Sequence, residues 1–370
     1  MTMETLAQPT TEEGMARTEA FVDRLMGSYI AGAELLTIEL GRRLGLYDAL
    51  RDVGPCTYAG LAERAGIPAR YAQEWLDQQA AAGIVDVVGG HGDERRFLLP
   101  DAYVPVLLEE VHPAHMMGLA PVLLGVARAL PAVADAYATG RGVHFADFGD
   151  ELRFGLGSLN RPGFAHDTRA WIEAMPDVAA RLDTGGTILD AGCGVGWSTI
   201  GLAQAFPRAT IVGIDLDAES IVEARANAVN AGVADRVSFV EGNAADERAL
   251  RPDHVEAYAL ITVYQALHDM GEPIQALTAF AAVLAEDGVV LVGDEHGSDE
   301  FEAPAGDVER LQLAVSVLHC LPATWAESDR IVNGTVLRGA TMREWVRAAG
   351  FDRLEVLDIE HPFWRFYRLG

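Results

Sequence analysis

Apolar residues recur at helical spacing over the first part of the chain. Between Thr18 and Arg51 they fall mostly three and four residues apart, which predicts a long helical stretch. A short helix follows, which Thr57 can cap and Gly66 can end, and a second helix is predicted over about 69–82. Two short apolar runs, 84–88 and 96–99, then predict a pair of strands joined by a polar, glycine-rich connection.

This order of helix, turn, helix and two-stranded wing predicts a winged-helix domain over residues 16–105, after a disordered tail at 1–15. Winged helices bind DNA or mediate contacts between proteins. The helix that would enter the major groove carries Glu74 and Asp77 against a single Arg70, whereas a groove-reading helix is normally basic. The charge therefore favours a protein-interaction module.

From residue 166 onward, short apolar runs alternate with helical segments. Seven runs predict strands: Thr187–Asp190, Thr210–Asp215, Val237–Glu241, Ala259–Tyr264, Val289–Asp294, Arg353–Ile359 and Phe363–Leu369. Alternating strands and helices predict an α/β fold with a doubly wound, mostly parallel seven-stranded sheet. The last two strands are separated by three residues, so they must pair antiparallel.

Two further segments complete the expected organisation. Residues 106–165 are predicted to form a helical connector between the winged helix and the α/β domain of residues 166–370. Within that domain, residues 297–338 form a long insertion after the fifth strand. Because such an insertion leaves the sheet at the carboxyl ends of its strands, it is expected to cover a ligand as a lid.

Charge and cysteine content narrow the possible functions. The formal net charge is −27, all 28 basic residues are Arg, and there is no Lys, which excludes Schiff-base chemistry and a P-loop. An acidic chain is a poor partner for nucleic acid or for an anionic membrane surface. Cys56, Cys193 and Cys320 are scattered without a Cys-x-x-Cys pair, so neither a disulfide framework nor a structural zinc site is expected, and no residue is assigned to a metal.

The location expected from the sequence is the cytoplasm. Residues 1–14 are polar and acidic, unlike a signal peptide. The most apolar stretch, 116–138, contains Pro121, Arg128 and Pro131, which favours buried helices over a membrane span.

The most informative segment is a glycine-rich turn after the first strand of the α/β domain. An apolar run ends at Asp190, and Gly192, Gly194 and Gly196 then precede a predicted helix. Asp215 ends the next strand, where a carboxylate can grip ribose hydroxyls. The two features together predict a nucleoside-bearing cofactor at the carboxyl ends of these strands.

Asp190-Ala191-Gly192-Cys193-Gly194-Val195-Gly196 resembles the first motif of the class I methyltransferases that use S-adenosylmethionine. The segments 214–217, 224–227, 232–239 and 241–244 agree with later motifs of that family in order and spacing. The resemblance covers about 164–370, and the front end resembles the dimerisation domain of small-molecule O-methyltransferases. A nicotinamide or flavin domain is the alternative, but it requires Gly three residues after Gly194, where this chain has Trp197.

The resemblance implies roles for the residues of the cofactor site. Gly192, Cys193 and Gly194 would contact the methionine part through backbone, and Asp190 would hold its ammonium group. Asp215 would take the ribose hydroxyls. The remaining residues assigned to the cofactor are Leu216, packed on adenine, Asn243 and Ala244 at the adenine edge, and Tyr264 and Gln265 after the fourth strand.

Candidate catalytic residues follow the fourth and fifth strands. His268-Asp269 resembles the His-Asp-Trp sequence that carries the catalytic histidine of many O-methyltransferases, with Met270 in place of Trp. A histidine suits proton removal from a phenol or enol near neutral pH, although His268 could equally pack or cap a helix. Glu295 is the candidate orienting carboxylate, with Asp294 beside it, and His296 is a rival base. His319 and Cys320 are expected to pack under the lid without pairing, since adjacent helical residues point about 100° apart.

These observations predict a homodimeric, S-adenosylmethionine-dependent enzyme of secondary metabolism that methylates a small molecule. O-methylation of an aromatic or polyketide-type acceptor is the first choice, and C- or N-methylation is an alternative. Two other hypotheses remain open: a DNA-binding regulator with a cofactor-sensing domain, and an enzyme that uses the cofactor for another reaction.

Overall fold

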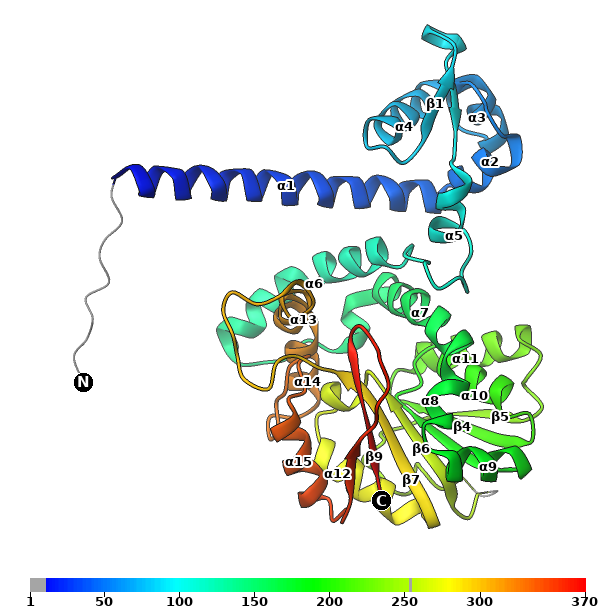
Figure 1. The fold of residues 1–370 in the computed structure, drawn as a ribbon, viewed down its shortest axis with the longest axis vertical. Helices are drawn as coiled ribbons and strands as arrows, with labels where there is room; N and C mark the ends of the chain where they lie inside the picture. Colours follow the sequence, from blue (N-terminus) through cyan, green and yellow to red (C-terminus); the bar gives the residue numbers. More distant parts are fainter. Residues whose placement is uncertain (1–10, 253–254) are drawn as a thin grey trace. The chain divides into compact units, whose positions relative to one another are not determined.

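The computed structural model describes residues 11–252 and 255–370, and it divides into two compact units between Glu109 and Glu110 (Figure 1). The first unit contains the helices α1 (Thr11–Arg43), α2 (Leu46–Val53), α3 (Tyr58–Ala65), α4 (Ala69–Ala81) and α5 (Val104–Leu107). Its two strands, β1 (Asp86–Gly89) and β2 (Arg96–Leu98), pair antiparallel as the predicted wing.

The helix expected between Thr18 and Arg51 is two helices. Gly45 adopts φ 63°, a left-handed conformation that favours glycine, and it separates α1 from α2. At the other end, α1 begins at Thr11, so residues 11–15 are helical rather than part of a disordered tail. Glu12 and Glu13 lie in the first turn, where negative charge stabilises a helix. Residues 1–10 of that predicted tail lie outside the described part of the chain.

The helix–turn–helix of the first unit follows the predicted capping. The Thr57 side chain accepts a hydrogen bond from the Gly60 amide at the start of α3, and Gly66 ends that helix at φ 69°. Gly41 lets α1 pack closely at its carboxyl end, because a Cβ there would lie 2.7 Å from both Trp75 and Tyr47.

The second unit is built on the expected sheet, with strand order β5-β4-β3-β6-β7-β9-β8. The strands are β3 (Gly186–Ala191), β4 (Ala209–Asp215), β5 (Val237–Glu241), β6 (Tyr258–Tyr264), β7 (Leu284–Glu295), β8 (Leu354–Val356) and β9 (Trp364–Leu369). All pair parallel except β9, which runs antiparallel to β7 and β8. The α/β fold class is therefore confirmed.

Helices cover both faces of this sheet (Figure 1). One face packs against α8 (Thr168–Glu173), α9 (Pro176–Thr184), α10 (Trp197–Ala205) and α11 (Ala218–Asn230). The other packs against α12 (Pro273–Val283) and α15 (Gly339–Ala348). The chain leaves β3 toward β4 on one side and returns with β6 on the other. This change of direction opens a crevice at the carboxyl ends of β3 and β6, the usual ligand site of such sheets.

Two predicted strands change in length. The strand β7 begins at Leu284 rather than Val289, so it is longer than predicted. The strand expected over Arg353–Ile359 is only β8, Leu354–Val356.

Two longer helices, α6 (Leu119–Thr139) and α7 (Gly149–His166), come before α8 in the second unit. By length and composition alone, α6 could cross a membrane. In the fold it packs against α7, with seven of its residues buried. The approach is close, since a Cβ on Gly125 would lie 2.7 Å from the Leu152 side chain. The insertion after β7 contains α13 (Asp307–Val315), a π-helix (Ser316–Cys320) and α14 (Leu321–Glu327).

Candidate active site

A cavity of about 560 Å³ lies at the carboxyl ends of β3, β4 and β6. Its walls come from the glycine turn, the segments after β4, β5 and β6, helix α7, and the 315–335 region of the insertion. Five carboxylates line it, against one guanidinium, that of Arg153: Asp215, Asp217, Asp269, Glu295 and Glu327. This excess of negative charge suits a positively charged ligand.

The glycine turn leaves room for a ligand at its centre. Gly192, Gly194 and Gly196 all have positive φ, between 50° and 85°. A Cβ on Gly194 would meet no atom within 4 Å, so this position faces open space in the cavity wall. A Cβ on Gly196 would instead lie 2.9 Å from Ala224, so that glycine serves close packing of the turn against α11.

Asp215 is held in place by backbone. Its two carboxylate oxygens accept hydrogen bonds from the Gly194 amide at 2.7 Å and the Asp217 amide at 2.9 Å. Burial raises the pKa of Asp215, and these two amides oppose that rise. The carboxylate lines the cavity with its remaining lone pairs available to a hydroxyl donor.

Asp190 lies behind the cavity wall and does not line it. One carboxylate oxygen accepts hydrogen bonds from the hydroxyls of Ser198 and Thr199, each at 2.6 Å, and the other accepts one from Thr262 at 3.0 Å. Asp190 therefore joins β3 to α10 and β6. The contact with a cofactor ammonium group expected from the sequence stays a prediction, and this geometry offers no direct path for it.

The other cofactor residues expected from the sequence line the same cavity. Leu216 is 52% exposed there, as a surface for a flat ring would be. Asn243 Oδ1 accepts the Ala245 amide at 2.8 Å, so this oxygen already has one partner before any adenine amine binds. Ala244 lines the wall, and Cys193 is buried, which raises the pKa of its thiol well above the usual range.

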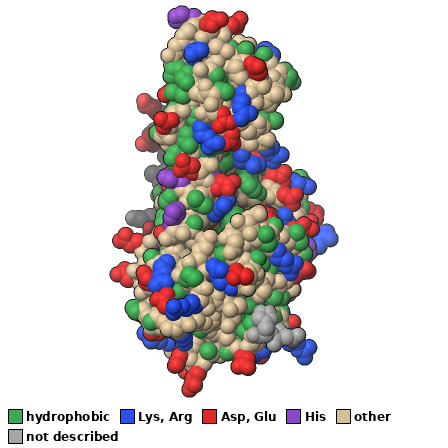
Figure 2. Space-filling model, turned by 90° about the vertical axis from the view of Figure 1, so that its right-hand side faces the viewer, with side chains coloured by type: hydrophobic (Ala, Val, Ile, Leu, Met, Phe, Trp, Pro, Cys, Tyr) green, Lys and Arg blue, Asp and Glu red, His purple; other side chains and the backbone are tan. Residues whose placement is uncertain are grey.

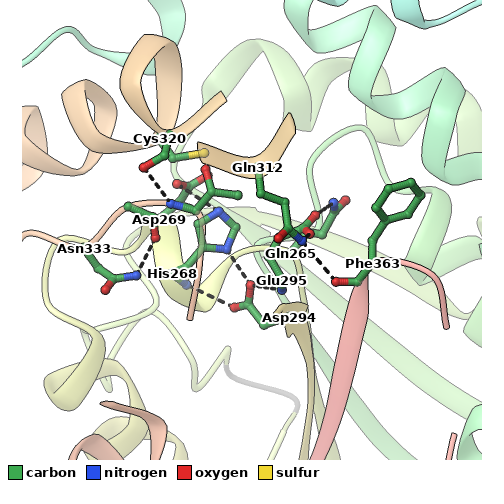
Figure 3. Close-up of polar contacts among 12 residues, drawn as sticks. Gln265, His268, Asp269, Asp294, Glu295, Gln312, Cys320, Asn333 and Phe363 are labelled. Atoms are coloured by element: carbon green, nitrogen blue, oxygen red, sulfur yellow. Dashed lines mark hydrogen bonds and ion pairs between the residues drawn. The ribbon is translucent and has the colours of Figure 1, made fainter. Parts of the chain in front are cut away.

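A chain of carboxamides surrounds Glu295 (Figure 3). Gln265 Nε2 donates to one Glu295 oxygen, and Gln312 Nε2 donates to the other at 2.5 Å. Asn160, from α7, donates to Gln265 Oε1 at 2.6 Å. Gln265 has φ 50°, the only positive φ of a residue other than glycine in the described chain. Backbone strain of this kind collects at functional sites. Tyr264, the last residue of β6, also lines the cavity.

His268 is the centre of the polar cluster in Figure 3. Its Nδ1 lies 2.5 Å from Asp294 Oδ1, and its backbone amide donates to the other Asp294 oxygen at 3.1 Å. On the opposite side of the ring, Nε2 lies 3.2 Å from Asp269 Oδ1. His268 and Asp269 line the cavity, whereas Asp294 is fully buried behind them. The Asp294 carboxylate thus fixes the tautomer and directs Nε2 to the cavity side.

The charges of the cluster are mutually dependent. Burial would lower the pKa of His268, but the carboxylates of Asp269 and Asp294 outweigh burial and hold that pKa well above the ordinary range. Burial would raise the pKa of Asp269, and the His268 charge lowers it overall. Burial also raises the pKa of Glu295 and brings that of Glu327 to about 7.

The insertion brings His319 and Cys320 to the cavity, where both are buried. Their side chains do meet, with Nδ1 of His319 3.5 Å from Sγ of Cys320, contrary to the separation expected from α-helical geometry. The reason is that both residues belong to a π-helix, whose wider turn changes the angle between neighbours. Burial raises the pKa of the Cys320 thiol to about 12, so it is no thiolate by itself.

Other residues of the site were not among the sequence candidates. Glu327 lines the cavity and accepts the Gly271 amide at 2.9 Å. Arg153, from α7, donates to Asp217 at 2.9 Å. The rival base His296, in contrast, lies in a surface hollow beside His361, outside this cavity.

The chain matches two described families. Residues 182–350 match a methyltransferase domain, and residues 32–107 match an Rv2258c-like winged helix-turn-helix domain. This chain carries a methyltransferase domain. The glycine turn, Asp215 and His268 all lie within it, and the winged-helix prediction is confirmed for the first unit.

Curated relatives resemble parts of this methyltransferase. A Synechococcus protein of uncharacterised function is 32% identical over 131 residues, which are 35% of this chain and 29% of the relative's length. The ubiquinone biosynthesis O-methyltransferase of Marinobacter nauticus is 25% identical over 183 residues, 49% of this chain and 71% of its own. The chain thus spans less than a third of the first relative.

Among solved structures, human N-acetylserotonin methyltransferase in complex with S-adenosylmethionine has the same fold. The TM-score is 0.69 at 15% sequence identity, over 99% of each chain. A putative O-methyltransferase from Nostoc punctiforme gives a TM-score of 0.68 at 18% identity, over 98% of this chain and 99% of that one. The methyltransferase therefore has the O-methyltransferase-like fold along its whole length.

S-adenosylmethionine is the cofactor expected from the sequence and the one bound in the human neighbour, and the residues of the cavity fit it. Gly194 leaves the space that a side chain would fill, and Asp215 presents acceptors for hydroxyl groups. Tyr264 Oη is buried without a hydrogen-bond partner in the described chain, as a group that awaits a ligand would be. The surrounding carboxylates suit a cationic sulfonium.

Proposed function

We propose that this methyltransferase O-methylates a small aromatic or polyketide-type molecule, with His268 as the general base. One observation carries the proposal: His268, whose Nδ1 is fixed by Asp294, lines the same cavity as Gly194 and Asp215. A base and a cofactor site in one cavity are what transfer to a hydroxyl group requires.

S-adenosylmethionine supplies, when bound, an electrophilic methyl group on a cationic sulfur. His268 would take the acceptor's hydroxyl proton at Nε2. Meanwhile Asp294 accepts the hydrogen bond from Nδ1–H and stabilises the imidazolium that forms. The resting imidazole has a raised pKa and must first lose its proton. A positive charge brought into the cavity lowers that pKa and so favours the basic form.

The acceptor side of the cavity supports an aromatic ligand. Phe145, Leu156, Phe164 and Met270 line the cavity together with Asn160 and Glu295. Mostly apolar walls with a few fixed polar groups are typical of small-molecule sites. We therefore propose phenols and enols as the acceptor class.

The test is methyl transfer to paired acceptors. The enzyme is incubated with S-adenosylmethionine and a panel of phenols, hydroxyquinones and the matched aryl amines, and products are detected by mass spectrometry. Methyl ethers should form, and His268→Gln should lose them. Methylation of the amines alone, at a rate that His268→Gln leaves unchanged, would contradict the proposal.

We also propose that the chain forms a homodimer through its first unit. Nine large apolar side chains of α1 are exposed, most of them on one stripe with a spacing of three and four residues: Met15, Phe21, Val22, Leu25, Met26, Tyr29, Ile30, Leu36 and Leu40. Exposed apolar stripes of this length mark protein interfaces. Light scattering should show a dimer that Leu25→Glu dissociates, whereas Glu19→Lys, an exposed polar change on the same helix, should leave it intact. A monomeric parent chain would contradict this proposal.

A DNA-binding role has no support from the first unit. On the face shown in Figure 2, acidic side chains lie interspersed with arginines rather than giving way to a basic field. We therefore expect no shift of genomic DNA fragments in a gel assay, and a shift would restore the regulator hypothesis.

A further inference from the structure

Three side chains of different ligand chemistry converge on the cavity side of His268. We propose that His268, Asp269 and Cys320 form a site for a divalent cation of the zinc class. This differs from the sequence expectation that the chain has no metal site. The site itself does not depend on the proposed function, although its effect on catalysis does.

The three ligand atoms are within reach of a single ion. One nitrogen of His268, one oxygen of Asp269 and Sγ of Cys320 all lie within 4.8 Å of one another. His268 Nε2 and Asp269 Oδ1 are already 3.2 Å apart, close to the separation of about 3.3 Å between nitrogen and oxygen ligands of a tetrahedral zinc ion. The Cys320 sulfur lies within 4.8 Å of both ligand atoms, and a bound ion would draw it to the usual zinc–sulfur distance.

A positive charge between His268 Nε2 and Asp269 Oδ1 would stabilise these two facing atoms. When the ring is neutral, with its one proton on Nδ1 toward Asp294, Nε2 bears a lone pair that faces a carboxylate oxygen. Beyond this mutual contact of 3.2 Å, neither atom forms a well-aligned hydrogen bond within the described residues, although His268 is almost fully buried. Two such acceptors at contact distance are stable only with a proton or a metal ion between them.

Asp294 completes the arrangement from behind. A metal-bound histidine almost always donates its other ring N–H to a carboxylate or carbonyl, which orients the ring and makes the ligand nitrogen more basic. His268 meets this condition, since Nδ1 lies 2.5 Å from Asp294 Oδ1. The backbone amides of His268 and Glu295 fix the Asp294 carboxylate in turn, at 3.1 and 2.8 Å.

The ligand set selects the class of ion. Nitrogen, carboxylate oxygen and thiolate sulfur together suit zinc and cobalt, whereas magnesium and calcium prefer oxygen ligands alone. On binding, the metal–sulfur bond replaces the Cys320 S–H bond, and the thiol proton passes to buffer. Three protein ligands leave a fourth position on the cavity side for water.

An ion at this site would inhibit methyl transfer. A bound cation takes the Nε2 lone pair, which His268 needs in order to accept a proton. The inhibition rests on the proposed function, and the binding does not.

Cobalt tests the site by spectroscopy on the full chain, without any turnover. Chelator-treated protein titrated with Co²⁺ should bind one ion per chain and show the near-ultraviolet sulfur-to-cobalt absorption of a thiolate ligand, which Zn²⁺ then displaces. Cys320→Ser should abolish this absorption and weaken binding by at least about 100-fold. Cys56→Ser, a thiol of the first unit, is the matched control and should keep the absorption.

Absence of the sulfur band in the folded parent protein would overturn the site, and so would a band that persists in Cys320→Ser. A crystal grown with Zn²⁺ needs no substitution, and its anomalous density should place the ion between the three ligand atoms. Density elsewhere, or none, would also refute the proposal.

The effect on activity separates the two proposals. Zn²⁺ should stop methyl transfer by the parent enzyme, and a chelator should restore it. Cys320→Ser, compared with its own metal-free rate, should require at least about 100-fold more Zn²⁺. Zinc that binds without slowing the reaction would refute the inhibition, while a chain that shows no methyl transfer at all would refute the proposed function and leave the cobalt result to decide the site.

Discussion

The two halves of the cavity are built by different means. The cofactor half consists of a turn and two strand ends, with Gly194 and Asp215 joined through a backbone amide. The acceptor half consists of side chains from separate segments, with His268 fixed by Asp294 and approached by Cys320 from the insertion. In the first half, backbone amides hold the groups that would bind the cofactor. In the second half, side chains set the pKa of His268 and the shape of the acceptor site. Substitutions in the two halves should therefore fail in different ways, in binding on one side and in rate on the other.

The substitution expected to separate the loss of rate from the loss of cofactor binding most clearly is at His268. Replacement of His268 by Gln keeps a polar side chain but removes the base, so kcat should fall about 10²- to 10⁴-fold. The dissociation constant of S-adenosylhomocysteine, measured by calorimetry, should stay within a few-fold of the parent value. A loss of cofactor binding as large as the loss of rate would show that the halves are not separate.

Asp215→Asn tests the other half. The change removes the charge that is proposed to receive the two ribose hydroxyl groups, and hydrogen bonds to charged groups are worth about 1.5–3 kcal/mol each. Cofactor affinity should weaken on the order of 10²- to 10³-fold, while kcat at saturating cofactor should fall much less. Glu219→Gln, at an exposed position in the first turn of α11 that does not line the cavity, serves as a control for general disturbance of this segment.

Asp294→Asn should change the pH dependence of the rate, measured with a chelator so that no cation competes for His268. Because Asp294 and Asp269 hold the pKa of His268 well above its ordinary range, the basic form increases as pH rises through that pKa. The rate should therefore rise toward alkaline pH. Without the Asp294 charge this limb should move to lower pH, with kcat reduced about 10- to 100-fold. A limb that Asp294→Asn leaves in place, but Glu327→Gln removes, would identify Glu327 as the titrating group.

The smallest effect on binding is expected at Asp190. Its carboxylate holds three hydroxyls behind the wall, so Asp190→Asn should lower the free energy of unfolding by about 1–3 kcal/mol. Cofactor affinity should change only a few-fold. An affinity loss as large as that of Asp215→Asn would restore the ammonium contact expected from the sequence.

That Gly194 and Asp215 lie at one cavity followed from the sequence more directly than the surroundings of His268 did, for a physical reason. Gly194 and Asp215 lie 21 positions apart on consecutive strand–turn units, and a parallel sheet brings such ends together without further information. The position of Asp190 depended on Ser198 and Thr199 of the next helix, whose hydroxyls turn its carboxylate away from the cavity. The spacing of residues along the chain does not reveal these contacts.

The acceptor half depends on contacts that sequence separation hides. His268 could be proposed from its neighbour Asp269, but its partner Asp294 is 26 residues away, and Cys320 arrives from the insertion. The meeting of His319 with Cys320 required a π-helix, which a period of 100° per residue cannot predict. Glu327 and Asn160 reached the site only through the tertiary packing of α14 and α7.

The position of helix α7 bears on how such an enzyme could change its preference for an acceptor molecule. It touches the cofactor half through Arg153 and Asp217, and the acceptor half through Asn160 and Gln265, yet it belongs to neither the glycine turn nor the base. Together with the insertion, α7 forms the part of the cavity wall that can change in sequence while the cofactor site and the base His268 stay the same. Diversification toward new molecules would then be concentrated in two segments, one before the sheet and one near its end.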